Sequence, residues 1–162
     1  MYKVNKDGIL FIMKEEGYML RPYMDVAGHR TIGVGHKLTP EESLVDGVEI
    51  NGELVGWDKG LTKRQVYCLL KKDIKWVETT INDYVTTTLN QGQVNALASL
   101  IFNIGASSFI DSTLLKAINA EQRREVSHQW RRWNKITVGG EKRILDALTR
   151  RRMRELLLFE NN

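Results

Sequence analysis

The stretch of residues 15–36, EEGYMLRPYMDVAGHRTIGVGH, constrains the fold more than any other part of this 162-residue chain. Just before it, apolar residues recur at the spacing of one helix face: Ile9, Ile12 and Met13. Gly17 is the kind of residue that ends a helix in a left-handed conformation, and Gly28 implies a turn. The pattern therefore predicts a helix that ends near Gly17, followed by a turn and a short strand over residues 31–35.

The same stretch carries two candidate catalytic carboxylates, Glu16 and Asp25. Glu16 falls within the apolar stripe of the predicted helix, so we expect partial burial to raise its pKa and let it serve as a general acid. Asp25 lies in a polar segment and should stay ionised, and the hydroxyl of Thr31 could hold a water between the two. Such a pair suits glycoside hydrolysis. Taken alone, the spacing also fits a surface Glu, a turn Asp and a strand Thr.

The pattern EEGxxLxxYxDxxGxxTIGxGH, residue for residue from Glu15 to His36, resembles the signature of the phage-type lysozymes (glycoside hydrolase family 24). These are endolysins that cut peptidoglycan at the end of a lytic infection. A second block, QVNALASLIFNIG (93–105) with the following STLL, and a third from Trp130 to Glu155 are similar to the family's helical lobe. The resemblance implies three catalytic roles, for a proton donor, a second carboxylate and a residue that positions water: Glu16, Asp25 and Thr31.

The fold that we expect is α+β, mainly helical and lysozyme-like, in a single domain. It would comprise an N-terminal lobe with an antiparallel sheet (about 1–61), a connecting helix (about 62–82) and a C-terminal helical lobe (about 83–162), with a cleft between the lobes. The connecting helix begins at TKRQ, which has capping-box spacing, and one face of it is apolar. The residues of that face are Val66, Leu69, Leu70, Val77 and Ile81.

Asp73 lies on the same helix face, where a carboxylate is costly unless it is paired. The resembling enzymes bring together a His and an Asp at the positions of His36 and Asp73. We therefore predict a structural ion pair between these two residues, with a catalytic histidine as the alternative.

Two further segments carry signals that predict local structure. VEINGELV has Asn51-Gly52 between alternating residues, which predicts a β-hairpin, and the TPEES segment before it departs most from the lysozymes. Asn90 and Gln93 repeat the capping spacing before a helix that is apolar almost all round, and such a helix is usually buried.

The resemblance implies that Phe102 and Asn103 contact sugar, and it matches Ser112 and Ser127 to polar substrate-binding positions. Core packing is an equal alternative for Phe102. Two tryptophans three residues apart, Trp130 and Trp133, are more often core than sugar-stacking residues. Gly140 stands where some relatives carry an arginine near the catalytic glutamate, which leaves the partner of Glu16 open, with Arg143 as a candidate.

The last predicted helix runs from about Glu141 to Phe159 and carries four arginines: Arg150, Arg151, Arg152 and Arg154. We expect an amphipathic packing helix with a solvated basic face. The alternative is a cationic segment that approaches lipopolysaccharide or acidic membrane lipid.

Composition narrows the function classes. The three histidines and the single Cys68 lack HxxxH or CxxC partners, so we expect no metal and no cofactor. A net charge of +4 without a recognisable reading motif argues against nucleic acid. The apolar run at residues 9–13 is too short for a signal peptide or a bilayer span, so we expect synthesis in the host cytoplasm and no stable membrane insertion.

These observations predict an endolysin, a monomeric lysozyme that hydrolyses the β-1,4 bond between N-acetylmuramic acid and N-acetylglucosamine in bacterial peptidoglycan. The resemblance implies that a holin opens the inner membrane and that the enzyme then acts in the periplasm. Inversion is favoured because Thr31 is a plausible water holder. The alternatives are a lytic transglycosylase, which needs no aspartate, and a non-catalytic membrane-active protein that acts through its basic C-terminal helix.

Overall fold

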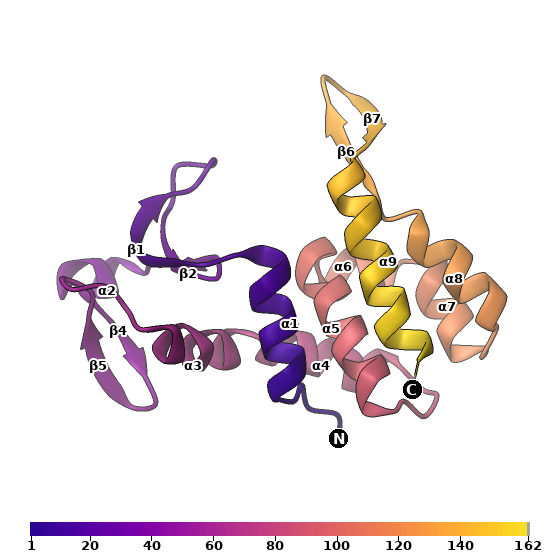
Figure 1. Cartoon of the computed structure of the whole chain (residues 1–162), viewed down its shortest axis with the longest axis horizontal. Coiled ribbons are helices and arrows are strands. Elements are labelled where there is room, and N and C mark those ends of the chain that lie inside the picture. The colour runs from indigo at the N-terminus through magenta and orange to yellow at the C-terminus, as the bar shows by residue number, and fades with distance from the viewer. Residues whose placement is uncertain (162) are drawn as a thin grey trace. The chain divides into compact units, whose positions relative to one another are not determined.

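A computed structural model of the protein describes residues 1–161, which form two compact units (Figure 1). The first unit comprises Ile9–Lys75 and carries two small antiparallel sheets. The second comprises Met1–Gly8 together with the residues from Trp76 onward, and most of its elements are helices. The prediction of a mainly helical α+β fold is confirmed.

The first helix, α1 (Lys6–Glu16), ends where the sequence predicts. The side chain of Asn5 accepts a hydrogen bond from the Gly8 N–H (3.0 Å), which satisfies one unpaired donor at the helix start. The predicted apolar stripe is buried: Ile9, Ile12 and Met13. Gly17 has a φ of +71° and its N–H donates to the Met13 carbonyl (3.0 Å), so a left-handed glycine ends the helix.

The three-stranded sheet of the first unit has the order β1–β2–β3, formed by β1 (Met19–Met24), β2 (Arg30–Gly33) and β3 (His36–Lys37). The strand predicted over residues 31–35 is present as β2, but it ends at Gly33 rather than at residue 35. The chain reverses after Gly33, Gly35 takes a φ of +67°, and His36 pairs back with Ile32. The reversal places His36 at the start of a new strand.

The predicted hairpin is confirmed as β4 (Gly47–Ile50) and β5 (Glu53–Gly56). Asn51 and Gly52 have φ values of +54° and +84°, the left-handed conformations that a tight two-residue turn requires. In the preceding segment, a capping box between Thr39 and Glu42 begins the short helix α2 (Pro40–Leu44).

The predicted connecting helix is two helices, α3 (Lys63–Asp73) and α4 (Lys75–Tyr84). The predicted capping box between Thr62 and Gln65 is present, and the predicted apolar face is buried. The prediction of one continuous helix is wrong, however, because the ψ of Ile74 is −1°, which turns the backbone out of the helical path.

The second unit is built around α5 (Gln91–Ile104), which begins with the predicted capping box between Asn90 and Gln93. Its apolar residues Val94, Leu97, Ala98 and Ile101 are buried. It packs along α9 (Asp146–Glu160), while α7 (Thr113–Asn119) packs against α8 (Arg123–Arg131) (Figure 1). The short α6 (Ala106–Ile110) links α5 to α7.

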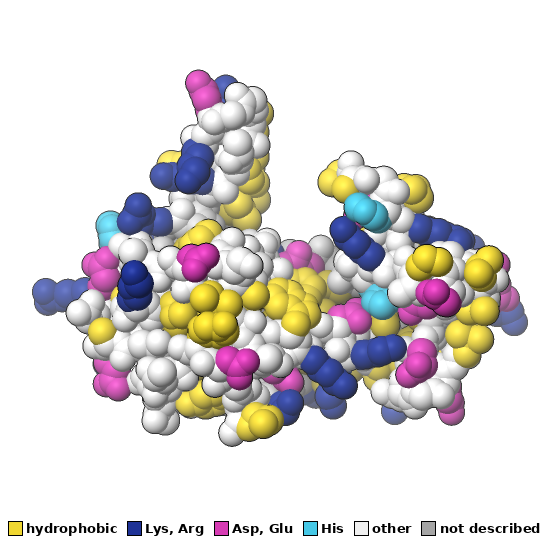
Figure 2. Space-filling model, turned by 180° about the vertical axis from the view of Figure 1, so that it is seen from behind, with side chains coloured by type: hydrophobic (Ala, Val, Ile, Leu, Met, Phe, Trp, Pro, Cys, Tyr) yellow, Lys and Arg dark blue, Asp and Glu magenta, His cyan; other side chains and the backbone are white. Residues whose placement is uncertain are grey.

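The start predicted for the last helix is wrong. Residues 135–144 form a β-hairpin of β6 (Lys135–Val138) and β7 (Glu141–Ile144), and α9 begins only at Asp146. Gly139 and Gly140 occupy the turn with φ values of +58° and +84°. Figure 2 shows hydrophobic side chains along one flank of this projecting hairpin, where Ile136 and Val138 are exposed.

Candidate active site

Glu16 is the last residue of α1 and is exposed, so the expected partial burial is wrong. The apolar stripe stays buried as far as Met13. At Glu16 the helix ends, and the chain leaves through Gly17, where a side chain would meet no atom within 4 Å. The periodicity places Glu16 on the correct face, but at an exposed position where the helix ends.

Asp25 is held in a tight loop between β1 and β2. Its Oδ1 accepts hydrogen bonds from the backbone N–H groups of His29 (2.7 Å) and Ala27 (2.9 Å). The His29 hydrogen bond is the main cause that holds the pKa of Asp25 below its usual value; desolvation opposes it, and the Ala27 N–H and the charges of His29 and Lys37 reinforce it. Asp25 is therefore ionised at neutral pH, as the sequence predicts.

Thr31 lies in β2 and is only 2% exposed. Its hydroxyl donates to the carbonyl of His29 (3.1 Å), the same carbonyl that accepts from the Asp25 N–H (2.9 Å). The peptide groups of His29 thus connect the Asp25 carboxylate to the Thr31 hydroxyl. Since the Thr31 hydrogen is used in this bond, the hydroxyl can meet a water only as an acceptor.

His36 lies between two carboxylates. Its Nδ1 is 2.9 Å from Asp73 Oδ2, and its Nε2 is 3.2 Å from Glu42 Oε2. Glu42 also caps α2 by accepting from the Thr39 N–H (2.9 Å). Only the imidazolium can donate from both ring nitrogens at once. The cluster therefore ties β3 to α2 and α3 when His36 is charged.

Two opposing effects act on the pKa of His36. Burial lowers it, but the hydrogen bond and charge of Asp73, followed by those of Glu42, outweigh burial and raise the pKa above its usual value. The prediction from the sequence paired His36 with Asp73 only. It missed Glu42 as the second partner of His36, although Glu42 stands three residues after Thr39, which is a capping-box signal.

In the second unit, Phe102 is half-buried and its ring stacks on that of Trp76, with centroids 6.1 Å apart and planes at 22°. Trp76 is 40% exposed, so the pair presents aromatic surface to solvent. Asn103 is exposed and its Oδ1 accepts from Arg152 Nη2 (3.0 Å). Trp76 was not among the residues predicted to contact substrate.

The two predicted serines have internal partners. Ser112 is the N-cap of α7: it is buried, accepts from the Leu115 N–H (3.0 Å) and donates to the Phe109 carbonyl (2.6 Å). Ser127 on α8 donates to the carboxylate of Glu160. The hydroxyl groups of both serines are therefore engaged within the second unit.

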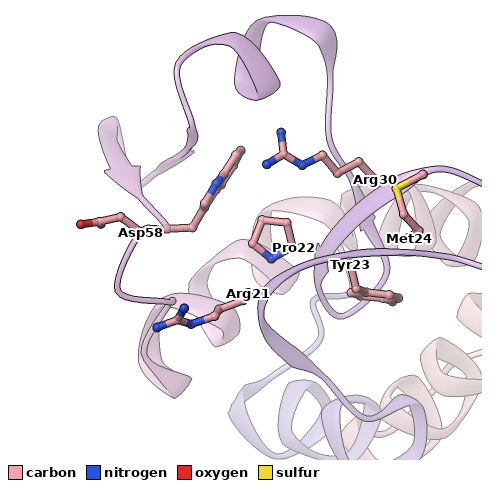
Figure 3. Close-up of a pocket in the computed structure, with 7 residues that line it drawn as sticks. Arg21, Pro22, Tyr23, Met24, Arg30 and Asp58 are labelled. Carbon is pink, nitrogen blue, oxygen red and sulfur yellow. The ribbon is translucent and has the colours of Figure 1, made fainter.

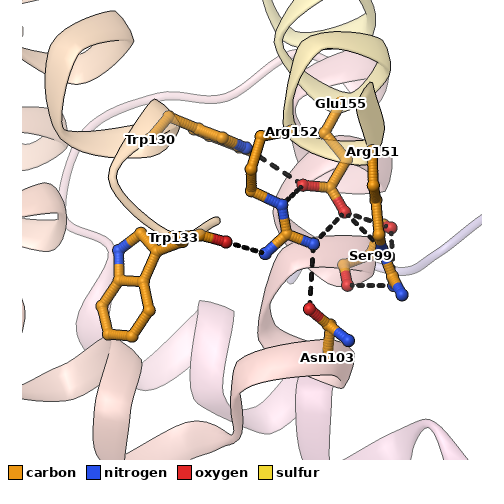
Figure 4. Close-up of polar contacts among 7 residues, drawn as sticks. All are labelled: Ser99, Asn103, Trp130, Trp133, Arg151, Arg152 and Glu155. Atoms are coloured by element: carbon orange, nitrogen blue, oxygen red, sulfur yellow. Dashed lines mark hydrogen bonds and ion pairs between the residues drawn. The ribbon is translucent and has the colours of Figure 1, made fainter. Parts of the chain in front are cut away.

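The solvated basic face expected on the last helix is only partly present, because two of its four arginines are buried. Arg151 and Arg152 are buried against Glu155, which is 0% exposed (Figure 4). Arg151 Nε donates to Glu155 Oε1 (3.0 Å), and Arg152 Nε forms an ion pair with Glu155 Oε2 (2.8 Å). A buried carboxylate draws both guanidinium groups inward because an unpaired buried charge is unfavourable. Arg150 and Arg154 remain on the exposed side.

Further side chains complete this cluster. Ser99 Oγ donates to Glu155 Oε1 (2.7 Å), and Trp130 Nε1 donates to Glu155 Oε2 (3.1 Å). Trp130 is fully buried, as the core interpretation predicts, and Trp133 is half-buried, with its carbonyl accepting from Arg152 (3.5 Å). Arg143, the candidate partner of Glu16, instead lies 3.5 Å from Glu141 in the β6–β7 hairpin.

Within residues 1–161, no group of three or more His, Cys, Asp or Glu side chains is arranged to hold a metal ion. None of the helices in the described part of the chain combines the length and the hydrophobicity needed to cross a bilayer.

Comparison with known protein families matches residues 13–155 to the family described as phage lysozyme. The chain belongs to the phage lysozyme family. The endolysin of Salmonella phage P22 is 36% identical over 159 residues, which cover 98% of this chain and 99% of the phage protein. The predicted family is thereby confirmed, and the family makes the chain a glycoside hydrolase.

Solved structures agree with this membership. A crystal structure of a P22 lysozyme mutant superposes with a TM-score of 0.79 at 34% identity and covers 98% of this chain and 99% of its own. The muramidase domain of SpmX from Asticaccaulis excentricus gives a TM-score of 0.82 at 26% identity, with 99% of both chains covered. The lysozyme-like fold is therefore common to the phage protein and to this second relative.

Proposed function

We propose that this enzyme hydrolyses the β-1,4 bond between N-acetylmuramic acid and N-acetylglucosamine in bacterial peptidoglycan. The observation that carries the proposal is the loop that holds Asp25 ionised: two backbone N–H groups hydrogen-bond to Oδ1, and the pKa of Asp25 is lowered. Membership of the phage lysozyme family supports the same reaction.

In this mechanism, Glu16 protonates the oxygen of the leaving sugar while a water attacks the anomeric carbon. Within the described residues, the contacts of the Asp25 carboxylate involve Oδ1, which leaves Oδ2 to accept one hydrogen of that water and to take up this proton as the new C–O bond forms. The oxygen of Thr31 accepts the other, because its own hydrogen is donated to His29. Direct attack by a water in this position inverts the anomeric configuration.

Phe102 and Asn103 are our proposed sugar contacts, with Trp76 supporting the ring of Phe102. We also retain Ser127 as a polar contact near the substrate. Ser112 has a different role in our account, since its hydroxyl is used as acceptor and as donor within the start of α7.

The test compares three variants on purified peptidoglycan: Glu16→Gln, Asp25→Asn and, as a control, Glu53→Gln at an exposed position of β5. Loss of a general acid or base typically costs about 10²–10⁴-fold in rate. We expect both active-site variants to fall by that amount and the control to keep wild-type activity. Retained activity in Asp25→Asn would exclude the two-carboxylate hydrolase and favour a lytic transglycosylase.

We further propose that the enzyme is a monomer that is made in the host cytoplasm and reaches the periplasm after a holin permeabilises the inner membrane. The support is the similarity to proteins named endolysin over nearly the whole chain. Expression in a bacterial host with and without a co-expressed holin tests this route: lysis is expected only when the holin is present. The burial of Arg151 and Arg152 argues against lysis by a cationic C-terminal helix alone.

A further inference from the structure

A pocket of about 370 Å³ lies in the first unit, where β1 and β2 meet the turn that follows β5 (Figure 3). Its volume is within the range of small-molecule sites, which is about 300–1,000 Å³. The residues that matter for its chemistry are two arginines, three apolar side chains and one carboxylate: Arg21, Arg30, Pro22, Met24, Trp57 and Asp58.

Two of the residues that line this pocket lie on the sheet face opposite to Thr31, and a third, Tyr23, lies on the same face as Thr31. In the antiparallel ladder, Tyr23 is opposite Thr31 and Met24 is opposite Arg30. Since successive residues of a strand point to opposite faces, Met24 and Arg30 lie on the face that Thr31 does not occupy. The proposed catalytic mechanism does not use any of the pocket's side chains.

Two guanidinium groups give the pocket its charge. Figure 3 shows Arg21 and Arg30 on either side of Pro22. The guanidinium carbon of Arg30 lies 5.4 Å from the centre of the Trp57 ring, an arrangement that holds the cation against an aromatic face. Arg21 is exposed and runs beside Gly60, which has a φ of +82°; a Cβ there would lie 3.4 Å from Arg21 Cγ.

The neighbouring carboxylates indicate which anion fits. Arg30 Nη2 lies 3.6 Å from Asp46 Oδ1, and Asp58 is part of the pocket wall. These negative charges disfavour a doubly charged phosphate, whereas a singly charged carboxylate matches the planar fork of a guanidinium. The apolar side chains Pro22, Met24 and Trp57 would pack against the aliphatic part of the same ligand.

We propose that this pocket binds a short peptide with a free carboxylate, the kind of group that the peptide stems of peptidoglycan carry. Arg21 and Arg30 bind the carboxylate, and Asp58 accepts a hydrogen bond from a peptide N–H. Binding at this position would recruit the wall polymer through its peptides while the sugar bond is cut elsewhere. The inference depends on the proposed function only for the source of the peptide.

The test is an NMR titration of the intact protein with the dipeptide L-alanyl-D-glutamate, with its diamide and with inorganic phosphate. We expect the dipeptide to shift the side-chain N–H signals of Arg21, Arg30 and Trp57, and the diamide to leave them unchanged. Loss of one charge-assisted pair typically weakens binding by about tenfold or more. Arg21→Gln should show that loss, while Arg64→Gln, an exposed arginine on α3, should bind normally.

Three outcomes would overturn the proposal: equal shifts with the diamide, phosphate binding as tight as that of the dipeptide, or unchanged affinity in Arg21→Gln. Because Arg30 packs on Trp57, Arg30→Lys serves as the second variant; it keeps the charge but loses the fork, and weaker binding is expected. Glu16→Gln should bind the dipeptide like the wild type, so failure of peptide binding and failure of the hydrolase mechanism are distinguishable.

Discussion

The buried carboxylate of Glu155 allows a quantitative prediction about the stability of the second unit. It receives Arg151 Nε and Ser99 Oγ at Oε1, at 3.0 and 2.7 Å, and Trp130 Nε1 at Oε2, at 3.1 Å. Arg152 contributes a hydrogen bond from Nη2 to Oε1 (3.0 Å) and an ion pair from Nε to Oε2 (2.8 Å). The substitution Glu155→Gln keeps the shape of this side chain and removes its charge.

Two losses add in this variant. The guanidinium groups of Arg151 and Arg152 are left without their buried counter-charge, and removing one partner of a buried ion pair costs about 3–5 kcal/mol. In addition, the new amide group cannot accept hydrogen bonds at every position that the carboxylate did. The expected fall in Tm is about 6–20 °C, since about 2–4 °C corresponds to each kcal/mol in a chain of this size.

Thermal unfolding followed by tryptophan fluorescence is the appropriate assay, because three of the four tryptophans lie in the second unit: Trp76, Trp130 and Trp133. The control is Glu141→Gln in the β6–β7 hairpin, where the exposed pair with Arg143 is worth about 0–1 kcal/mol. If Glu155→Gln lost no more stability than Glu141→Gln, the buried cluster would not stabilise the unit in the way described.

Three other predictions concern local stability. The raised pKa of His36 stabilises the folded state. This stabilisation is complete below the pKa of histidine in the unfolded chain and is lost as pH rises through the pKa of His36 in the folded protein. In urea unfolding, Asp73→Asn should therefore lower the free energy of unfolding more at pH 5.5 than at pH 9. Gly52→Ala should cost about 1–2 kcal/mol at its φ of +84°, measured against Gly56→Ala, where no positive φ is required. Ser112→Ala should cost about 0.5–2 kcal/mol as a lost helix cap, with kcat and KM on peptidoglycan unchanged; a raised KM would restore the substrate role.

Local chemistry made several features predictable. The capping boxes at Thr62 and Asn90 involve residues three apart, and the Asn51-Gly52 turn is determined by the backbone preferences of two residues. The end of α1 at Gly17 has the same local origin. In each case the residues that determine the conformation are close neighbours in the chain, so no knowledge of tertiary packing was needed.

The sequence-based predictions failed where contacts between residues far apart in the sequence determine the structure. Periodicity assigned the C-terminal arginines to a solvated face, but a buried Glu155 holds Arg151 and Arg152 inside, next to Ser99 of α5. Glu155 follows Arg151 by four residues and Arg152 by three, so helical spacing could predict that these side chains pair. The same spacing could not predict that the pairs are buried against α5.

The exposure of Glu16 is a similar case. The helical spacing is correct, yet the side chain is exposed because the helix ends at this residue. By contrast, the β6–β7 hairpin had a local signal, Gly139-Gly140 between alternating residues, which the prediction of a long last helix overlooked.

Digestion of purified peptidoglycan in ¹⁸O-labelled water shows whether a water molecule cleaves the muramic acid bond. The released fragments are reduced at once with borohydride and analysed by mass spectrometry. The proposed mechanism predicts one ¹⁸O atom on C1 of the reducing-end N-acetylmuramic acid. Label on N-acetylglucosamine, label in the peptide, or unlabelled anhydro-sugars would contradict it.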